Sequence, residues 1–253
     1  MMELTAGSER FRDDHGEADL AVAAALEAYA AGTGGEHAVL TALADSRLLI
    51  PVVAVLADDL ASPAAGAGDG ESPASPPAGQ TGLPREGEKA SEMAMPAIVG
   101  RDGRRALPAF TSAEAVRRWQ PTARPVPVAA SGVWKSAAHE SWAVVIDIAG
   151  PVPVVVEGAR LAALAEGAQA PAMHEDPDVW QQVAAAAAEI APGIRLKLSP
   201  APEGVDFTLE LAPPAGAARP VPDDAASQIA AGATARLGGR VRAGIAVIVR
   251  PPG

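Results

Sequence analysis

Histidines are the first residues to consider for metal or acid–base chemistry, and their spacing argues against both. The sequence contains four of them, and each stands alone, without a second histidine at the spacing of a metal-ligand pair. They are His15, His37, His139 and His174. We expect surface residues rather than ligands or catalytic bases.

Carboxylates cluster once, at Asp13, Asp14, Glu17 and Asp19. They could hold a divalent cation weakly, but they lack the spacing of a calcium-binding loop, and acids are favourable beside the N-terminus of a helix. Cysteine is absent, which excludes a thiol nucleophile, an iron–sulfur cluster and a cysteine-ligated zinc site. No nucleophile elbow or phosphate-binding loop is present either. We therefore expect no catalytic residue, no metal and no cofactor.

Arginines concentrate in one stretch of the chain, close to a tryptophan. The stretch contains Arg101, Arg104, Arg105, Arg117, Arg118, Trp119 and Arg124. An aromatic ring among arginines can stack on nucleobases, but a hairpin turn followed by a short exposed helix would produce the same pattern. As a candidate interaction surface we take Arg105, Arg117, Arg118, Trp119 and Arg124.

The charge of the whole chain opposes nucleic acid as the main partner. Its 253 residues include 20 Lys plus Arg against 31 Asp plus Glu, a net charge of −11. Binding to nucleic acid or to an anionic membrane requires a basic face, so we expect neither as partner. Residues 58–92 alone carry 2 basic and 7 acidic residues among many prolines and glycines, which predicts a disordered acidic insert. No signal peptide or membrane span is predicted, so we expect a cytoplasmic protein.

The elements that must position these residues begin with two helices and a strand. Apolar spacing predicts helices over 18–31 and 36–44, and an apolar run predicts a buried strand over 47–56. Leu20, Ala24 and Ala28 form the expected apolar stripe of the first helix, with Val22, Leu26 and Tyr29 nearby, and Gly32 ends the helix. Pro51 places the strand at a sheet edge or at a bulge.

After the insert, a turn at residues 100–103 predicts a hairpin of residues 93–99 and 105–110. Thr111 and Glu114 have the spacing of a capping box, which predicts a helix through Trp119. Up to residue 170 we expect further helices over 129–139 and 158–165 and strands over 142–148 and 152–156.

The sequence of residues 171–253 predicts a small domain. Asp176 and Pro177 start a helix that runs to residue 193, residues 194–198 and 205–211 alternate as a hairpin, and a second helix begins at residue 222. A buried strand at 245–249 completes an α-β-β-α-β domain over 171–253. The expected fold is therefore α+β, an α/β sandwich, with a mixed sheet and flanking helices in a first domain over 1–170.

Several segments resemble one protein family. They are LPAFTSAEAVRRW at 107–119, ARPVPV at 123–128, VVIDIAGPVPV at 144–154, YAAGTGGEHAVL at 29–40 and RLLIPV at 47–52. Together they resemble the SseB family, in the form of its N-terminal domain that occurs in actinobacteria. The resemblance covers residues 18–165 apart from the insert. It implies an α/β domain of bacterial cytoplasmic proteins, linked by name to serine sensitivity and type III secretion, with no catalytic residues to assign.

Two hypotheses for the function follow. The favoured one is a non-enzymatic protein-interaction or regulatory module, whose sheet edges pair with another protein and which could also form a homo-oligomer. The alternative is a small-molecule-binding regulator or an enzyme with a site between the two domains.

Overall fold

The computed structural model describes residues 11, 14–56, 91–101, 103–202, 204–217 and 220–252 of the chain. In order, the elements are α1 (Leu20–Ala31), α2 (Glu36–Ala44), β1 (Arg47–Leu56), β2 (Ser91–Ala94), β3 (Ile98–Val99), β4 (Arg105–Ala109), α3 (Ala113–Trp119), β5 (Arg124–Ala129), α4 (Ala130–His139), β6 (Ala143–Ile146), β7 (Val154–Val156), α5 (Gly158–Ala165), α6 (Pro177–Ile190), β8 (Arg195–Ser199), β9 (Phe207–Ala212), α7 (Asp223–Leu237), the 3-10 turn η2 (Gly238–Arg240) and β10 (Ile245–Val249). The expected α+β fold is confirmed.

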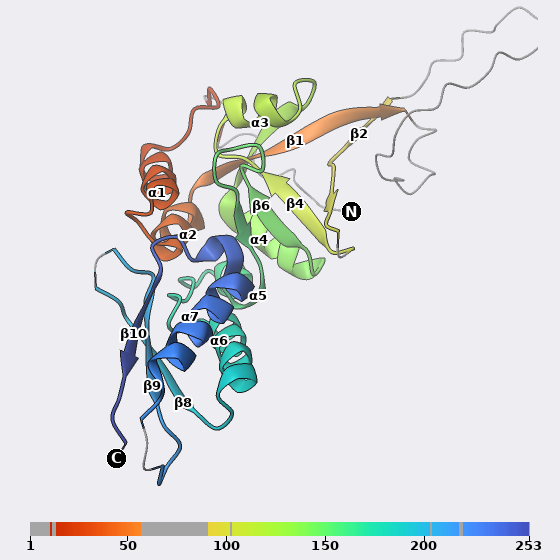
Figure 1. Ribbon diagram of the computed structural model, residues 1–253. Helices are drawn as coiled ribbons and strands as arrows, with labels where there is room; N and C mark the ends of the chain where they lie inside the picture. The colour runs from red at the N-terminus through yellow and green to blue at the C-terminus, as the bar shows by residue number, and fades with distance from the viewer. Residues whose placement is uncertain are drawn as a thin grey trace, which may run out of the picture.

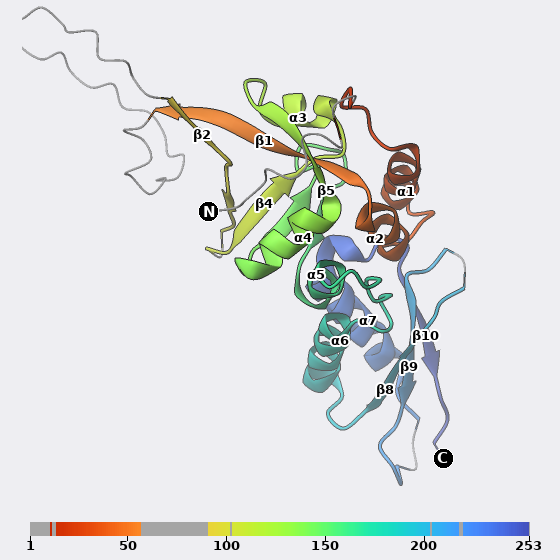
Figure 2. The same cartoon turned by 180° about the vertical axis from the view of Figure 1, so that it is seen from behind.

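The elements form two units, which Figure 1 shows one above the other. The N-terminal unit holds α1–α5 and β1–β7, and the C-terminal unit holds α6, α7 and β8–β10. Helices α2 and α5 lie where the units meet, as the reverse view in Figure 2 also shows.

Helix α1 ends where the sequence predicts and begins two residues after the predicted start at residue 18. Asp19 accepts hydrogen bonds from two backbone N–H groups of the first turn, and Gly32 ends the helix in the left-handed conformation with φ 71°. The expected stripe is wrong, because Leu20 is 88% exposed while Val22 and Tyr29 are buried. In a helix made mostly of alanine, the few large side chains decide which face packs inward.

Strand β1 is the centre of the sheet β2-β1-β5 rather than an edge. Its register places Pro51 opposite Pro125 and Leu49 opposite Pro127. The N–H and C=O groups of Leu49 bond to Phe110, away from β5, so these opposite pairs are of the non-hydrogen-bonded kind. The three prolines therefore lie where the β1–β5 ladder needs no N–H group, and the pairing of β1 with β2 begins two residues after Pro51.

The second sheet has the order β3-β4-β6-β7, with β4 and β6 parallel. The predicted hairpin is confirmed for β3 and β4, which are joined by a turn closed by the bond from Gly100 N–H to the Arg104 carbonyl. Met93 and Ala94 are a correction, because they belong to β2 and pair with β1.

The capping box predicted at Thr111 and Glu114 is wrong. Ser112 caps α3 by accepting a hydrogen bond from the backbone N–H of Ala115. The hydroxyl of Thr111 instead donates to the Asp147 carboxylate at the end of β6. Two adjacent hydroxyl residues can each cap a helix, and the tertiary contact to Asp147 selects the second.

The C-terminal unit has the predicted element order. Asp176 caps α6 ahead of Pro177, and β9 lies between antiparallel β8 and parallel β10. Strand β10 is a half-buried edge strand, not the buried strand expected from its sequence, because only β9 pairs with it.

Each unit has its own hydrophobic core. The larger cluster includes Leu48, Trp134 and Ile146, and the second is built around Phe207 and Leu209. The clusters separate between residues 170 and 173. The domain boundary at residue 170 stays a prediction, and residues 58–90 of the predicted insert lie outside the described residues.

Candidate functional site

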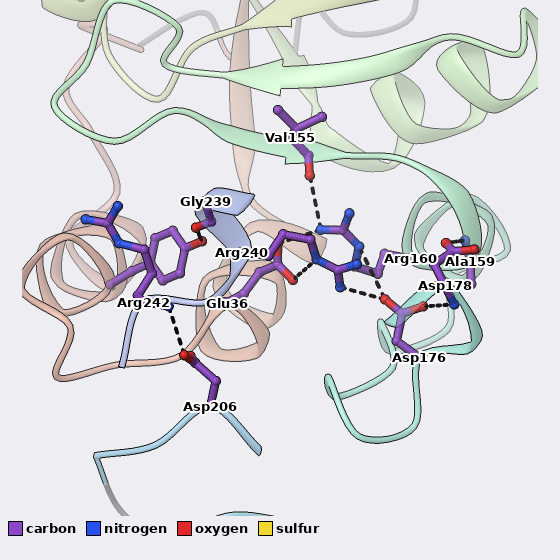
Figure 3. A network of polar contacts seen from close by, with 11 residues as sticks. Glu36, Val155, Ala159, Arg160, Asp176, Asp178, Asp206, Gly239, Arg240 and Arg242 are labelled. Carbon is purple, nitrogen blue, oxygen red and sulfur yellow. Dashed lines mark hydrogen bonds and ion pairs between the residues drawn. The ribbon is translucent and has the colours of Figure 1, made fainter. Parts of the chain in front are cut away.

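Four charged side chains meet where the two units touch, and Figure 3 shows them from close by. Glu36 is the first residue of α2, Arg160 lies in α5, Asp176 caps α6 and Arg240 ends η2. We call them the ionic quartet. Glu36 is in the first turn of its helix and Asp176 precedes the first turn of α6, where a negative charge is favoured by the helix dipole. Their charges sum to zero.

Short contacts join the quartet in a ring. Arg160 Nη1 donates to Glu36 Oε1 at 2.6 Å, Arg240 Nε donates to Glu36 Oε2 at 3.0 Å, and Arg240 Nη2 donates to Asp176 Oδ2 at 2.6 Å. Arg160 Nε lies 3.6 Å from Asp176 Oδ2 and completes the ring as an ion pair. Each arginine thus contacts one carboxylate of each unit, so the quartet fixes how the two cores sit together.

The pKa values of the two guanidinium groups shift in opposite directions. Arg160 is only 3% exposed, and desolvation lowers its pKa despite the nearby carboxylates of Glu36 and Asp176. Burial also acts to lower the pKa of Arg240, but the charge of Glu36 and the hydrogen bond to Asp176 outweigh it and raise that pKa. The nearby carboxylates and hydrogen bonds therefore offset the cost of burying the positive charge less well for Arg160 than for Arg240.

A second link lies beside the quartet. The hydroxyl of Tyr29 in α1 donates to the Gly239 carbonyl at 2.7 Å, and the guanidinium of Arg242 lies 5.6 Å from the Tyr29 ring centre. Asp206 holds the residues around Arg242 by accepting three backbone N–H groups on Oδ2. Burial and the charge of Glu36 raise the pKa of Tyr29 to about 12.

The start of α5 is held by the other unit. Asp178 of α6 accepts a hydrogen bond from Ala159 N–H at 3.0 Å and so caps a helix that does not cap itself. Gly158 has φ +59°, and a Cβ atom there would lie 2.0 Å from Asp178 Oδ2. Only glycine fits this close approach.

A cavity of about 520 Å³ opens between the units at this place. We call it the cleft. Its walls come from α1, α2, β7, α5, α6, α7 and η2, and its polar lining includes Tyr29, Glu36, Arg160, Asp178, Gln181, Gln182 and Arg240. Arg104 and Arg236 also border it, paired with Glu157 and Glu189 respectively. Side chains of both signs therefore line the cleft, with the two amides of α6 among them.

The predicted arginine surface is divided by the fold. Arg117 and Arg118 pair with Glu114 on the exposed side of α3, and Trp119 packs half-buried against Phe110. Exposed Arg124 starts β5, directly after a residue that packs on α3. Exposed Arg105 starts β4, the strand that leads toward α3, and its guanidinium lies 5.7 Å from the ring centre of Trp142. The surface stays a prediction, and Arg105 is not part of the α3 group.

None of the histidines joins the cleft lining. His15 and His139 are exposed, whereas His37 and His174 are half-buried. In the acidic cluster, Asp14 pairs with Arg47, and Asp13 lies outside the described residues. Within the described part of the chain, no group of three or more histidine or acidic residues could hold a metal ion.

Asp147 is a half-buried carboxylate that lies apart from the cleft. It has φ 49° at the end of β6 and accepts hydrogen bonds from the N–H and hydroxyl groups of Thr111. Burial raises its pKa even though both bonds from Thr111 act to lower it. The contact holds the chain between β4 and α3 in place.

Sequence reasoning missed the quartet, and it named none of the residues of the cleft, although the alternative hypothesis placed a site between the two domains. Two local signals existed: Arg160 interrupts an apolar helical segment, and Asp176 precedes a proline as a helix cap. Neither signal says that Arg160 and Asp176 come together with Glu36 and Arg240, which lie 204 positions apart in the sequence.

None of the helices in the described part of the chain combines the length and apolar character that crossing a membrane requires. The family model of the SseB protein N-terminal domain matches residues 22–163, more than half of the chain. No curated protein and no solved structure matches the chain.

Proposed function

Because the chain belongs to the SseB family, we propose that it is a non-enzymatic cytoplasmic regulatory module, in which a small polar ligand in the cleft controls binding to another protein. One observation carries the proposal: a cavity of about 520 Å³ lies between the two cores, and both units supply its polar wall. A ligand in such a cavity contacts both units and so stabilises one arrangement of them.

The chemistry of the lining supports binding rather than catalysis. The acidic side chains of the lining are already engaged: Glu36 pairs with Arg160 and Arg240, Glu157 pairs with Arg104, and Asp178 accepts the N–H of Ala159. The arginines of the lining pair with carboxylates and would hold a ligand by hydrogen bonds.

The proposed binding site for the protein partner is strand β10. An edge strand free of proline and charge is open to pairing with another extended chain. Strand β10 is such an edge, with the sequence IAVIV and Ile248 41% exposed, whereas the opposite edge strand β8 carries Arg195 and Lys197.

Ligand binding is tested by thermal unfolding with a library of cellular metabolites. Gln182→Trp fills the cleft from α6, and Ala185→Trp places the same side chain on the exposed face of that helix. We expect a metabolite to raise the Tm of the wild type and of Ala185→Trp, but not of Gln182→Trp. If no metabolite raises the Tm, the ligand-controlled module is wrong.

The partner is tested by co-purification with the tagged chain from native cells. We expect a specific protein to be retained by the wild type and lost with Ile248→Lys, which adds a charge to the β10 edge. Thr234→Lys on α7 is the matched control. A second copy as the only partner would show as a dimer that Ile248→Lys converts to a monomer, and retention by all three chains would refute the β10 site.

A further inference from the structure

The ionic quartet has more hydrogen-bond donors than it uses. Arg160 Nη1 donates to Glu36 Oε1 and, at 3.1 Å, to the Val155 carbonyl. Its buried Nε has no hydrogen-bond partner, only the long ion pair to Asp176, and no bond from Nη2 is found among the described residues. A guanidinium group has five N–H donors in a fixed plane, so most of those of Arg160 remain available.

Arg160 lies in the wall of the cleft. Arg160 borders the cavity although its side chain is only 3% exposed, and Figure 3 shows its guanidinium between Val155 and the Arg240 side chain. A buried donor without an acceptor costs free energy, and the cavity is large enough for a molecule that supplies one. Burial also lowers the pKa of Arg160, so a further negative charge would be favourable beside it.

The other wall groups limit the charge of that molecule. The carboxylates of Glu157 and Asp178 also border the cavity. A doubly charged anion would be repelled by them, whereas a singly charged one can turn its donor groups toward them and toward the amides of Gln181 and Gln182.

We infer that the cleft binds a small organic carboxylate, whose oxygen atoms accept hydrogen bonds from Arg160 and whose hydroxyl or other donor groups face the carboxylates and amides of the opposite wall. The inference rests on the proposed ligand-binding function and adds the chemical class of the ligand. The planar donor pair of an arginine matches the two oxygens of a carboxylate.

Nuclear magnetic resonance titration of the full chain tests the class with three named probes. Glycolate supplies a carboxylate and a hydroxyl, inorganic phosphate supplies a doubly charged oxyanion, and chloride controls for salt at equal ionic strength. The reporters are the side-chain amides of Gln181 and Gln182 and the Nε–H of Arg160. We expect saturable shifts with glycolate and only small linear shifts with chloride and phosphate.

Variants locate the binding. Arg160→Lys keeps the charge but loses the planar donor pair, so we expect glycolate to bind roughly 10- to 100-fold more weakly. If Arg160→Lys unfolds, Gln181→Leu on the opposite wall is read instead, with Ala185→Leu as the matched control. Gln181→Leu should weaken glycolate binding, and Ala185→Leu should not.

The outcomes separate the two proposals. Saturable shifts with phosphate in place of glycolate would overturn the carboxylate class and leave a ligand-binding cleft standing. Glycolate shifts equal to those of chloride would overturn the class as well, and the metabolite library would then decide the proposed function independently.

Discussion

Replacing Arg160 by methionine tests whether the ionic quartet holds the two units together. Methionine keeps an unbranched apolar side chain but removes the guanidinium, so the buried carboxylates of Glu36 and Asp176 share only Arg240. Breaking a buried ion pair from one side costs about 3–5 kcal/mol, because a charge is left without compensation. A domain of ordinary stability unfolds with about 5–15 kcal/mol, so the loss should be large.

Urea unfolding followed by tryptophan fluorescence and far-ultraviolet circular dichroism measures this loss. The tryptophans report both units, since Trp134 is buried in the N-terminal core and Trp180 lies on α6 of the C-terminal unit. Arg236→Met is the matched control, because its partner Glu189 is 66% exposed. Exposed ion pairs contribute about 0–1 kcal/mol, so the control should change little.

Two results would refute the reasoning. Equal losses for Arg160→Met and Arg236→Met would mean that burial of the quartet adds nothing. A loss for Arg160→Met that disappears at high salt would mean that the contacts are solvated, because salt screens exposed pairs far more than buried ones.

Three further changes test neighbouring contacts. Tyr29→Phe should cost about 0.5–1.5 kcal/mol by removing the bond to Gly239, and ultraviolet absorbance of the wild type, which has one tyrosine, should give a midpoint near pH 12. Asp147→Asn should be at least as stable as the wild type at neutral pH, because the neutral amide can replace a carboxylate whose pKa burial raises. Gly158→Ala should cost at least 1–3 kcal/mol, roughly the strain of its positive φ, with more from the displacement of Asp178.

The raised pKa values of Tyr29 and Asp147 determine the direction in which folding stability changes with pH. The pKa of Tyr29 is raised in the folded chain, so its contribution is full below the ordinary value of 10.0 and is lost as pH rises to about 12. The pKa of Asp147 is also raised, so wild-type stability should fall as pH rises from the ordinary value of 3.8 through the raised value, and Asp147→Asn should lack this fall. A tyrosine midpoint near 10, or an Asp147→Asn variant with the pH dependence of the wild type, would contradict these assignments.

For Gly158→Ala, unchanged stability would show that α5 can move away from α6.

Elements with strong local signals could be predicted from the sequence. Helices α2 and α5 occupy the expected residues, and α6 begins at the expected cap of Asp176 and Pro177. Such signals act within one turn of chain, so they survive whatever the tertiary structure is.

Strand β5 could not be predicted, because prolines at 125 and 127 normally argue against a strand. Only the register with β1 shows that both lie at positions where the ladder needs no N–H group. The residues of the cleft could not be predicted for a related reason, because its charged side chains become neighbours only after the two units pack. The predicted arginine surface stays a prediction, and Arg105, although close to Arg117 in sequence, starts the strand that leads toward α3.

The prolines of β5 also determine which sheet edge of this protein can pair with a strand of another chain. Strand β5 is an edge of its sheet, and residues 125 and 127 direct their backbone groups outward. Because both are prolines, that edge offers carbonyl oxygens without the N–H groups between them, and an approaching strand would find only half of its hydrogen bonds. The N-terminal unit is thus closed to strand exchange along β5, while β10 at the other end of the molecule carries a full set of donors and acceptors.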